Sequence, residues 1–370
     1  MNTILALLKE KSVKKIIVEK EDVVDTKVIN NHQSISLNLQ ISVEYAHQES
    51  SCAVMTFGEY ILDWLYNVKA NELKPSSFDR KEQTVKYQVI PHIGNKDMYD
   101  LTADDVQKMI NALKKEYSYS TIKKAYECVN ACLKYAVKKR ILPYNVAESV
   151  IIPKNLEREK SDVQCFTDDE VEKIEKEAVR CYKNGKRIYR MGEITILIVN
   201  TGLRIGEALA LEWSDINFKK KTLKVRKNMV YVKSRSDSGK AYQYIKQTST
   251  KTKHGSRIVP LNSAAIRALI SLKGINGKTP YVLATSKGKR VTPRNVDRMF
   301  RSILRCCNIK ETGIHTLRHT FASRLFAKGV DVKIVSELLG HADVGITYDT
   351  YIHLIQEQRI VAVDVLENVL

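Results

Sequence analysis

Four segments in the C-terminal half of this chain combine arginine, lysine, histidine and tyrosine at spacings that could carry out chemistry. The first is TGLRIGEALAL, where a Thr-Gly turn leads into a helix with Arg204 in its first turn. A helix N-terminus attracts anions, and a guanidinium binds phosphate oxygens through two hydrogen bonds. Glu207, three residues on, shares that helix face and could orient Arg204. The glycine spacing differs from G-x-G-x-x-G, so a dinucleotide fold is not indicated.

The second segment is KTKHGSRIVPL, which places Lys251 and Lys253 beside a turn between two expected strands. A mobile lysine at such a turn could protonate a leaving oxygen. A charged hairpin tip without a chemical role explains the segment equally well. Position alone leaves the choice between Lys251 and Lys253 open.

The third segment is HTLRHTFASRLFAKG, which predicts a helix with His315 and Arg318 on neighbouring positions of one turn. His315 and His319 are four residues apart, as in a zinc-binding helix. The H-E-x-x-H signature requires glutamate where Thr316 stands, and no cluster of cysteine or acidic residues lies close by in the sequence. We therefore expect no metal site here.

The fourth segment is LLGHADVGITYDTYIHL, in which His341 follows the glycine that ends one helix. The next helix is expected to begin near Asp343 and to carry Tyr348 and Tyr351. Packing is the default interpretation for any single one of the 18 tyrosines. Tyr348 and Tyr351 share one helix face, so spacing does not choose between them.

Taken together, the segments supply two arginines, a lysine, two histidines and a tyrosine. They contain no acidic pair, no metal-ligand set and no Ser/His/Asp order. This combination predicts metal-free phosphoryl transfer: cations would neutralise a pentacoordinate phosphate, histidine and lysine would move protons, and a phenol would attack.

In their order along residues 201–354, the four segments resemble those of tyrosine recombinases of the phage and conjugative-transposon integrase type. Residues 56–150 are similar in pattern to the core-binding domain of that family. The resemblance implies a mainly α fold with small β elements: a helical core-binding domain, a mixed α/β catalytic domain and a small β-containing N-terminal segment.

The resemblance also implies roles for individual residues. Arg204 and Arg318 would hold the non-bridging oxygens of the scissile phosphate. Tyr351 would attack the phosphorus, forming a 3′-phosphotyrosine and releasing a 5′-hydroxyl that Lys251 would protonate. The reaction would be site-specific recombination of DNA, as in the integration or excision of a mobile element.

Supporting roles follow from the same resemblance. His315 and His341 would assist proton transfer and phosphate binding, and Glu207 would be structural. The basic stretch from Lys219 to Arg257 holds thirteen lysines and arginines and one acid, which favours contacts with the DNA backbone. The candidates for these contacts are Lys233, Arg235, Lys253 and Arg257.

The resemblance implies particular partners and cofactors. A phosphotyrosine conserves the energy of the broken bond, so no cofactor, ATP or metal is expected. The partners would be double-stranded DNA with paired core sites and three further copies of the chain, forming a homotetramer on two duplexes. A small accessory protein that sets directionality is a further candidate, and no membrane is involved.

The distribution of charge supports an anionic partner. The formal net charge is +19, from 61 lysines and arginines against 42 acids. Residues 1–50 carry −1, residues 51–160 carry +4, and residues 161–370 carry +16. General solubility would not predict this concentration beside the motifs, whereas nucleic-acid binding does.

The pattern of apolar residues predicts the domain organisation. Residues 35–43 alternate as in a half-buried strand, so residues 1–50 are expected to form a β-containing arm or small domain. Residues 54–150 read as a helical, DNA-clamping domain, 151–164 as a linker and 165–370 as a catalytic domain with a C-terminal tail. The tail is apolar enough to dock on a neighbouring copy. The acidic balance of residues 1–50 leaves arm-site DNA binding and a protein contact equally open.

Composition also indicates the cellular compartment of the protein. No stretch reaches the roughly 18 apolar residues of a membrane span, and the seven scattered cysteines lack C-x-x-C spacing. We therefore expect reduced thiols and a cytoplasmic, nucleoid-associated protein.

Two alternatives share many of these features. A type IB topoisomerase would use the same phosphotyrosine chemistry, but would relax supercoils without paired sites. A DNA-binding regulator with a degenerate site would form no covalent complex. The presence of all six expected catalytic residue types disfavours the regulator.

Overall fold

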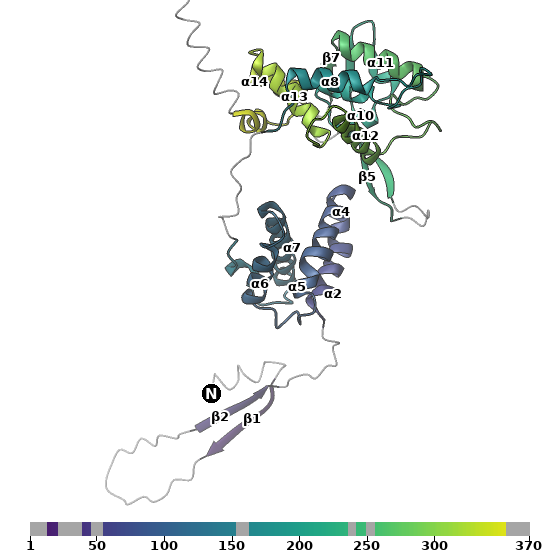
Figure 1. Ribbon diagram of the computed structural model, residues 1–370. Coiled ribbons are helices and arrows are strands. Elements are labelled where there is room, and N and C mark those ends of the chain that lie inside the picture. Colours follow the sequence, from purple (N-terminus) through teal and green to yellow (C-terminus); the bar gives the residue numbers. More distant parts are fainter. Residues whose placement is uncertain are drawn as a thin grey trace, which may run out of the picture.

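The computed structural model describes residues 13–20, 39–45, 55–152, 163–235, 242–248 and 256–352. Within these ranges the fold is mainly helical with small β elements, as the sequence predicts. Figure 1 shows an N-terminal hairpin, a helical unit and a larger mixed unit along the chain. The helical unit and the mixed unit each contain their own hydrophobic core.

The N-terminal hairpin pairs β1 (Val13–Lys20) with β2 (Leu39–Tyr45) in antiparallel fashion. The prediction of β structure in the first fifty residues is therefore confirmed for these two segments. Residues 35–38, which share the alternating pattern, lie outside the described residues, as does Cys52.

Successive helical segments build the helical unit. They are α2 (Phe57–Asp63), η1 (Trp64–Lys69), α3 (Ala70–Glu72), α4 (Pro75–Thr84), η2 (Val85–Val89), α5 (Ile90–Ile93), α6 (Ala103–Leu113), α7 (Tyr119–Lys138) and η3 (Val146–Ser149). A capping box at Thr102 and Asp105 begins α6, with the Thr102 hydroxyl accepting from the Asp105 N–H at 3.2 Å. Trp64, Phe57 and Leu65 are buried at the centre of this unit.

The helix through α4 and α5 passes Pro91 by way of a π-helical turn. Proline lacks the N–H that would continue the hydrogen-bond ladder, and π turns accommodate such interruptions. The helix ends at Gly94, whose N–H bonds the Ile90 carbonyl at 2.9 Å. The helix therefore continues past Pro91 and ends at Gly94.

The mixed unit surrounds two small sheets with helices. Its elements are α8 (Asp168–Ala178), α9 (Glu193–Thr201), α10 (Ile205–Ala210), η5 (Trp213–Asp215), β3 (Ile216–Asn217), β4 (Thr222–Val225), β5 (Lys227–Lys233), β6 (Tyr242–Thr248), β7 (Arg257–Pro260), α11 (Ser263–Asn276), α12 (Pro293–Cys306), α13 (His315–Ala327) and α14 (Val332–Leu339). Residues 344–352 form a further helix. One sheet has the order β3-β4-β7, and β5 and β6 form a separate hairpin. The strand expected after the turn in KTKHGSRIVPL is present as β7.

Gly202 allows α9, which is buried along most of its length, to turn sharply into α10. Its φ of +64° lies in the left-handed region that glycine adopts without strain. A Cβ at this position would lie 2.5 Å from the Phe321 ring of α13. The turn therefore brings the start of α10 against α13, where three of the four sequence segments meet.

Candidate active site

Arg204 lies at the N-terminal cap of α10, immediately after the Gly202 turn. Its backbone N–H donates to Glu207 Oε2 at 2.9 Å, and its Nη1 donates to Glu207 Oε1 at 3.0 Å. The same guanidinium donates to the carbonyl oxygens of Leu339 at 3.3 Å and Gly340 at 3.2 Å, at the end of α14. Glu207 orients Arg204, as the sequence spacing predicts, and α14 fixes its other side.

Arg257 contacts the same carboxylate from β7. Its two terminal nitrogens donate to Glu207 Oε1 at 3.0 Å and Oε2 at 2.8 Å, and its Nε donates to the Leu338 carbonyl at 2.7 Å. The Arg257 side chain is only 9% exposed. Arg257 therefore holds Glu207 and α14 in this structure, and its predicted contact with DNA stays a prediction.

Glu207 is consequently a carboxylate between two arginines. Burial alone would raise its pKa, but the hydrogen bonds and charge of Arg257, together with Arg204, lower the pKa of Glu207 to about 2. The side chain is ionised throughout the physiological range, and it ties α10 to β7.

Arg318 is almost fully buried on α13, at 3% exposure. Its Nη1 donates to the Gly202 carbonyl at 2.6 Å, and its Nη2 donates to the Leu339 carbonyl at 2.8 Å and lies 2.9 Å from His341 Nε2. All three partners are neutral groups. Burial and the positive charge of Arg204 lower the pKa of Arg318, which shows that the pocket does not supply a full counter-charge.

His341 completes this group through both ring nitrogens. Since a guanidinium only donates, Nε2 accepts from Arg318, and Nδ1 of the neutral ring carries the proton toward Thr347 Oγ1 at 2.6 Å. Thr347 is fully buried on the helix of residues 344–352. Burial and the charge of Arg318 lower the pKa of His341 to about 4, so the ring is neutral at pH 7.

Tyr351 lies on the same short helix and is 1% exposed. Its hydroxyl is 2.7 Å from Nδ1 of His319, and its ring packs against Phe326 at a centroid distance of 5.4 Å. Burial raises the pKa of the Tyr351 phenol above its ordinary value. His319 is not among the site residues predicted from the sequence, where it appears only as a possible zinc ligand. Its position, next to Arg318 and four residues after His315, was the available signal.

His315 occupies the first turn of α13 and is exposed. Its ring meets that of His319 edge to face, with centroids 4.8 Å apart. Together with Arg318, these two histidines share one face of the helix, as the three- and four-residue spacings predict.

Most of the predicted site residues are therefore gathered in one place. Arg204, Glu207, Arg318 and His341 are linked by direct hydrogen bonds or through shared carbonyl groups, and Tyr351 joins through His319. Lys251 and Lys253 lie outside the described residues. No cluster of three possible metal ligands occurs among the residues that the structure describes.

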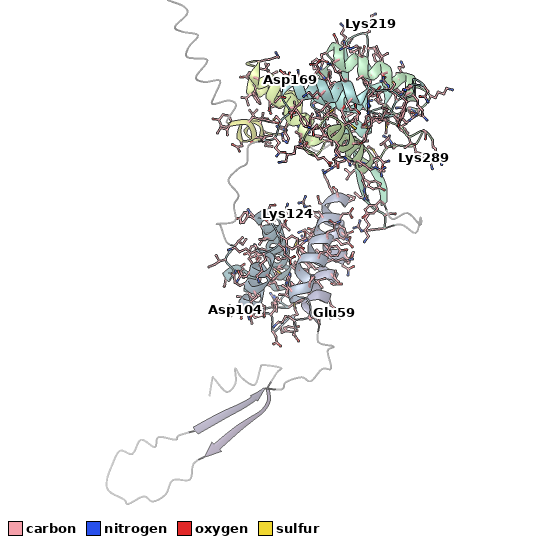
Figure 2. The ribbon with its side chains drawn as sticks, in the orientation of Figure 1. Glu59, Asp104, Lys124, Asp169, Lys219 and Lys289 are labelled. Carbon is pink, nitrogen blue, oxygen red and sulfur yellow. The ribbon has the colours of Figure 1, made fainter. Side chains whose placement is uncertain are left out.

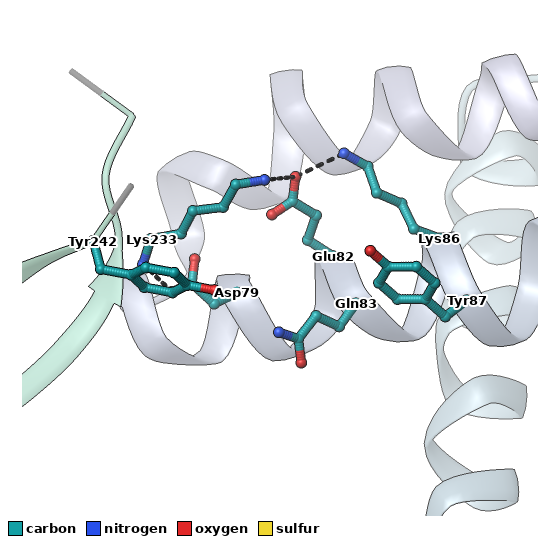
Figure 3. A pocket seen from close by; sticks show the side chains of 7 residues that line it. All are labelled: Asp79, Glu82, Gln83, Lys86, Tyr87, Lys233 and Tyr242. Carbon is teal, nitrogen blue, oxygen red and sulfur yellow. Dashed lines mark hydrogen bonds and ion pairs between the residues drawn. The ribbon is translucent and has the colours of Figure 1, made fainter. Parts of the chain in front are cut away.

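Lys233 and Arg235 lie elsewhere, where the β5–β6 hairpin meets α4 of the helical unit. Arg235 donates to Asp79 at 2.6 Å and to Glu82 at 3.1 Å. The Lys233 backbone N–H donates to Asp79 at 2.8 Å (Figure 3). Both residues thus contact acidic side chains of α4 in this structure, and their predicted contacts with DNA stay predictions. The guanidinium of Arg235 also stacks on Phe78, 4.5 Å from the ring centroid.

The central group carries an excess of positive charge. Arg204, Arg257 and Arg318 with Glu207 leave two positive charges among four side chains. A cavity of about 280 Å³ lies beside them, lined by residues that include Arg257, Gly340 and His341. Donors aimed at one place, with an uncompensated charge, suit a bound phosphate oxyanion.

Known proteins resemble this chain in both sequence and fold. The phage integrase family matches residues 164–358, and the N-terminal SAM-like domain of phage integrases matches residues 56–114. The tyrosine recombinase XerC-like protein of Caldanaerobacter subterraneus subsp. tengcongensis is 30% identical over 338 residues, covering 85% of this chain and 83% of that protein. The integrase of Staphylococcus phage L54a is 24% identical, covering 83% of this chain and 91% of that protein.

Solved structures agree in fold. The Tn1549 transposon integrase in complex with a circular intermediate DNA superposes with a TM-score of 0.66 at 19% identity, covering 80% of this chain and 95% of that one. A lambda integrase tetramer bound to a Holliday junction superposes with a TM-score of 0.59 at 18% identity, covering 81% and 78%. In the described residues, no helix is both long and apolar enough to span a bilayer. With the family match over more than half of the chain, these findings show that this protein belongs to the phage integrase family and is a tyrosine-type site-specific recombinase.

Proposed function

We propose that this recombinase cuts and rejoins DNA through a 3′-phosphotyrosine at Tyr351, during the integration or excision of a mobile element. The observation that carries the proposal is the convergence of the Arg204 and Arg318 guanidinium groups beside His341, because their excess positive charge suits a phosphodiester. Tyr351 enters the same group from the adjacent helix, because its partner His319 directly follows Arg318 in the sequence.

In this proposal each residue of the site has a separate role. The two guanidinium groups bind the non-bridging oxygens and stabilise the negative charge that grows on them during attack. His341, with Nδ1–H held by Thr347, accepts from Arg318 through Nε2 and so helps to orient that guanidinium for the phosphate. Lys251 protonates the 5′-oxygen that leaves, and His315 binds the phosphate from the exposed start of α13.

The choice of Tyr351 as the nucleophile rests on the contact that its own phenol makes. The hydroxyl of Tyr351 lies 2.7 Å from an imidazole nitrogen beside Arg318, and Tyr351 is buried. A proton acceptor within hydrogen-bond distance is what an attacking phenol requires.

The partners are double-stranded DNA and further copies of the chain. Relatives bind circular intermediate DNA and, as a tetramer, a Holliday junction. By this likeness, four copies assemble here on two duplexes with paired core sites, helped by an accessory directionality protein. The C-terminal tail, which lies outside the described residues, docks on the neighbouring copy, so deletion beyond residue 355 abolishes synapsis and retains DNA binding.

We assign DNA clamping to the two larger units, with boundaries at residues 54–150 and 165–370. Lys124 of the helical unit lies at its end nearest the mixed unit, while Glu59 and Asp104 lie at the opposite end (Figure 2). A groove of about 550 Å³ there is lined by residues that include Arg80, Lys124 and the stacked Tyr231 and Tyr242. Cations interleaved with aromatic rings suit a DNA backbone and its bases.

Covalent trapping tests the proposal. Wild-type protein is mixed with a nicked duplex from the ends of the DNA segment that carries its gene, so that loss of the short 5′ fragment traps the adduct. We expect an adduct with wild type and with Tyr348→Phe, and none with Tyr351→Phe. An adduct with Tyr351→Phe would move the nucleophile elsewhere.

The same assay separates the alternatives. Relaxation of supercoiled DNA that lacks paired sites would indicate a topoisomerase. Sequence-specific binding without an adduct on any flanking DNA would indicate a regulator on the same fold.

A further inference from the structure

We propose that His319 is the general base that accepts the proton of the attacking Tyr351. The inference rests on the proposed function, because it concerns the phenol that forms the phosphotyrosine. A phenol loses its proton when its oxygen bonds to phosphorus, so the site needs an acceptor at that oxygen. His319 Nδ1 lies 2.7 Å from the Tyr351 hydroxyl.

The surroundings of this pair fix the direction of the hydrogen bond. Burial and the positive charges of neighbouring His315 and Arg318 disfavour a charged imidazole and lower the pKa of His319 to about 4. A neutral imidazole carries one proton, and burial keeps the Tyr351 phenol protonated. The phenol therefore donates to Nδ1, and the ring proton of His319 lies on Nε2.

Other groups near the hydroxyl are less suited to accept the proton. Arg318 only donates, and burial raises the pKa of the Cys165 thiol, the other titratable neighbour that acts on Tyr351. His341 directs Nε2 to Arg318 and Nδ1 to Thr347. His315 lies against His319 through its ring rather than against the phenol.

The step balances as follows. A lone pair of the Tyr351 oxygen forms the O–P bond while its proton moves to Nδ1 of His319. The P–O5′ bond breaks with its electron pair on O5′, which takes a proton from the general acid, assigned above to Lys251. In rejoining, O5′ of the 5′-hydroxyl bonds to phosphorus and its proton returns to the deprotonated Lys251. The P–O bond to Tyr351 breaks with its electron pair on the phenol oxygen, to which His319 returns the proton.

The position of His319 on α13 makes it suitable for both half-reactions. His319 directly follows Arg318, so the group that binds the phosphate and the group that takes the proton move together. Phe326, two turns further along the helix, packs against the ring of Tyr351. The rigid helix thus sets the distance between phenol, base and phosphate.

The test uses His319→Asn, whose side-chain oxygen can replace Nδ1 as a hydrogen-bond acceptor but cannot take up a proton. His92→Asn, at an exposed histidine of the helical unit, is the matched control. Single-turnover cleavage is measured on the nicked duplex that wild type cleaves. We expect a loss on the order of 100-fold or more for His319→Asn, as for removal of a general base, and no change for the control.

A fluorinated tyrosine at position 351 distinguishes proton transfer from positioning. Its phenol ionises more readily and needs a base less, so it should restore at least tenfold of the lost rate in His319→Asn and change wild type little. A duplex with bridging sulfur at the 5′ position, which leaves without an acid, should not rescue the variant. Cleavage within threefold of wild type, equal fluorotyrosine effects in both proteins, or rescue by sulfur would each overturn the proposal.

A measurement on unmodified protein stands even if the variant fails to fold. In nitrogen NMR of histidine-labelled protein, Nδ1 of His319 should be unprotonated at pH 7, and Tyr351→Phe should shift it. A protonated Nδ1 would overturn the proposal. Failure of wild type to form any adduct would instead contradict the proposed function, while this spectrum would still decide the state of the pair.

Discussion

Replacement of Glu207 by glutamine should destabilise the mixed unit by about 3 kcal/mol. Arg204 and Arg257 lower the pKa of this buried carboxylate from 4.5 to about 2. At about 1.4 kcal/mol per pH unit, this difference corresponds to about 3 kcal/mol of stabilisation. Removal of one partner from a buried ion pair typically costs about 3–5 kcal/mol, which agrees with the lower end.

The pH dependence has a definite sign. Because the folded state lowers the pKa of Glu207, its stabilisation is fully present above about pH 5 and disappears as the pH falls toward 2. The difference between wild type and Glu207→Gln should therefore be greatest at pH 7 and should shrink below pH 4.5.

The two tryptophans allow a specific assay. A Trp64→Phe background leaves Trp213, which packs against the core of the mixed unit, as the only tryptophan. Urea unfolding followed by its fluorescence gives the stability at each pH. Glu311→Gln, which removes an exposed ion pair with Arg305, is the control and should cost less than about 1 kcal/mol. A cost below 1 kcal/mol for Glu207→Gln, or the same cost at pH 3 as at pH 7, would refute the reasoning.

Three further outcomes are expected. Gly202→Ala should destabilise the protein by at least about 2 kcal/mol in urea unfolding, because of the left-handed φ and the contact with Phe321. Gly274→Ala, in the last turn of α11 where a Cβ meets open space, should stabilise it by about 0.5–1 kcal/mol. Equal effects of the two substitutions would contradict this reasoning. Thr347→Val should slow cleavage about fivefold with unchanged DNA binding, because one hydrogen bond to His341 of about 1 kcal/mol is lost; an unchanged rate would show that this bond does not orient the ring. Since burial keeps His341 neutral, single-turnover cleavage should show no inflection near pH 6.5 and should fall only toward pH 4.

The sequence predicted the site residues best where chemistry and local spacing agree. Arg204 and Glu207 are three residues apart at a helix start, and His315 and Arg318 share one helical turn. In both cases a short-range rule fixes the relative position of the side chains, and the structure follows it. The strands around residues 222–260 were predictable for the same reason, from alternation within each segment.

Contacts between distant segments were not predictable in this way. His319 faces Tyr351 across 32 residues, and Arg257 meets Glu207 across 50. Nothing in the local pattern of either segment specifies its partner, because the turn at Gly202 and the packing of α13 decide which faces meet. Consequently the local pattern indicates neither the contact of His319 with Tyr351 nor that of Arg257 with Glu207.

The arginines show why net charge predicts an anionic partner but does not predict which residues bind it. Arg257 is paired with Glu207, and Arg235 is paired with Asp79 and Glu82 of the helical unit. Arg318 instead donates its hydrogen bonds to neutral acceptors. Each contributes the same single charge to the surplus of +19. Of these three arginines, Arg318 alone is buried without an acidic hydrogen-bond partner. This condition favours the binding of an anion from outside the protein. The structure thus points to Arg318 as the arginine best suited to bind a phosphate, because no acidic side chain of the protein is hydrogen-bonded to it. Amino-acid composition does not contain this information.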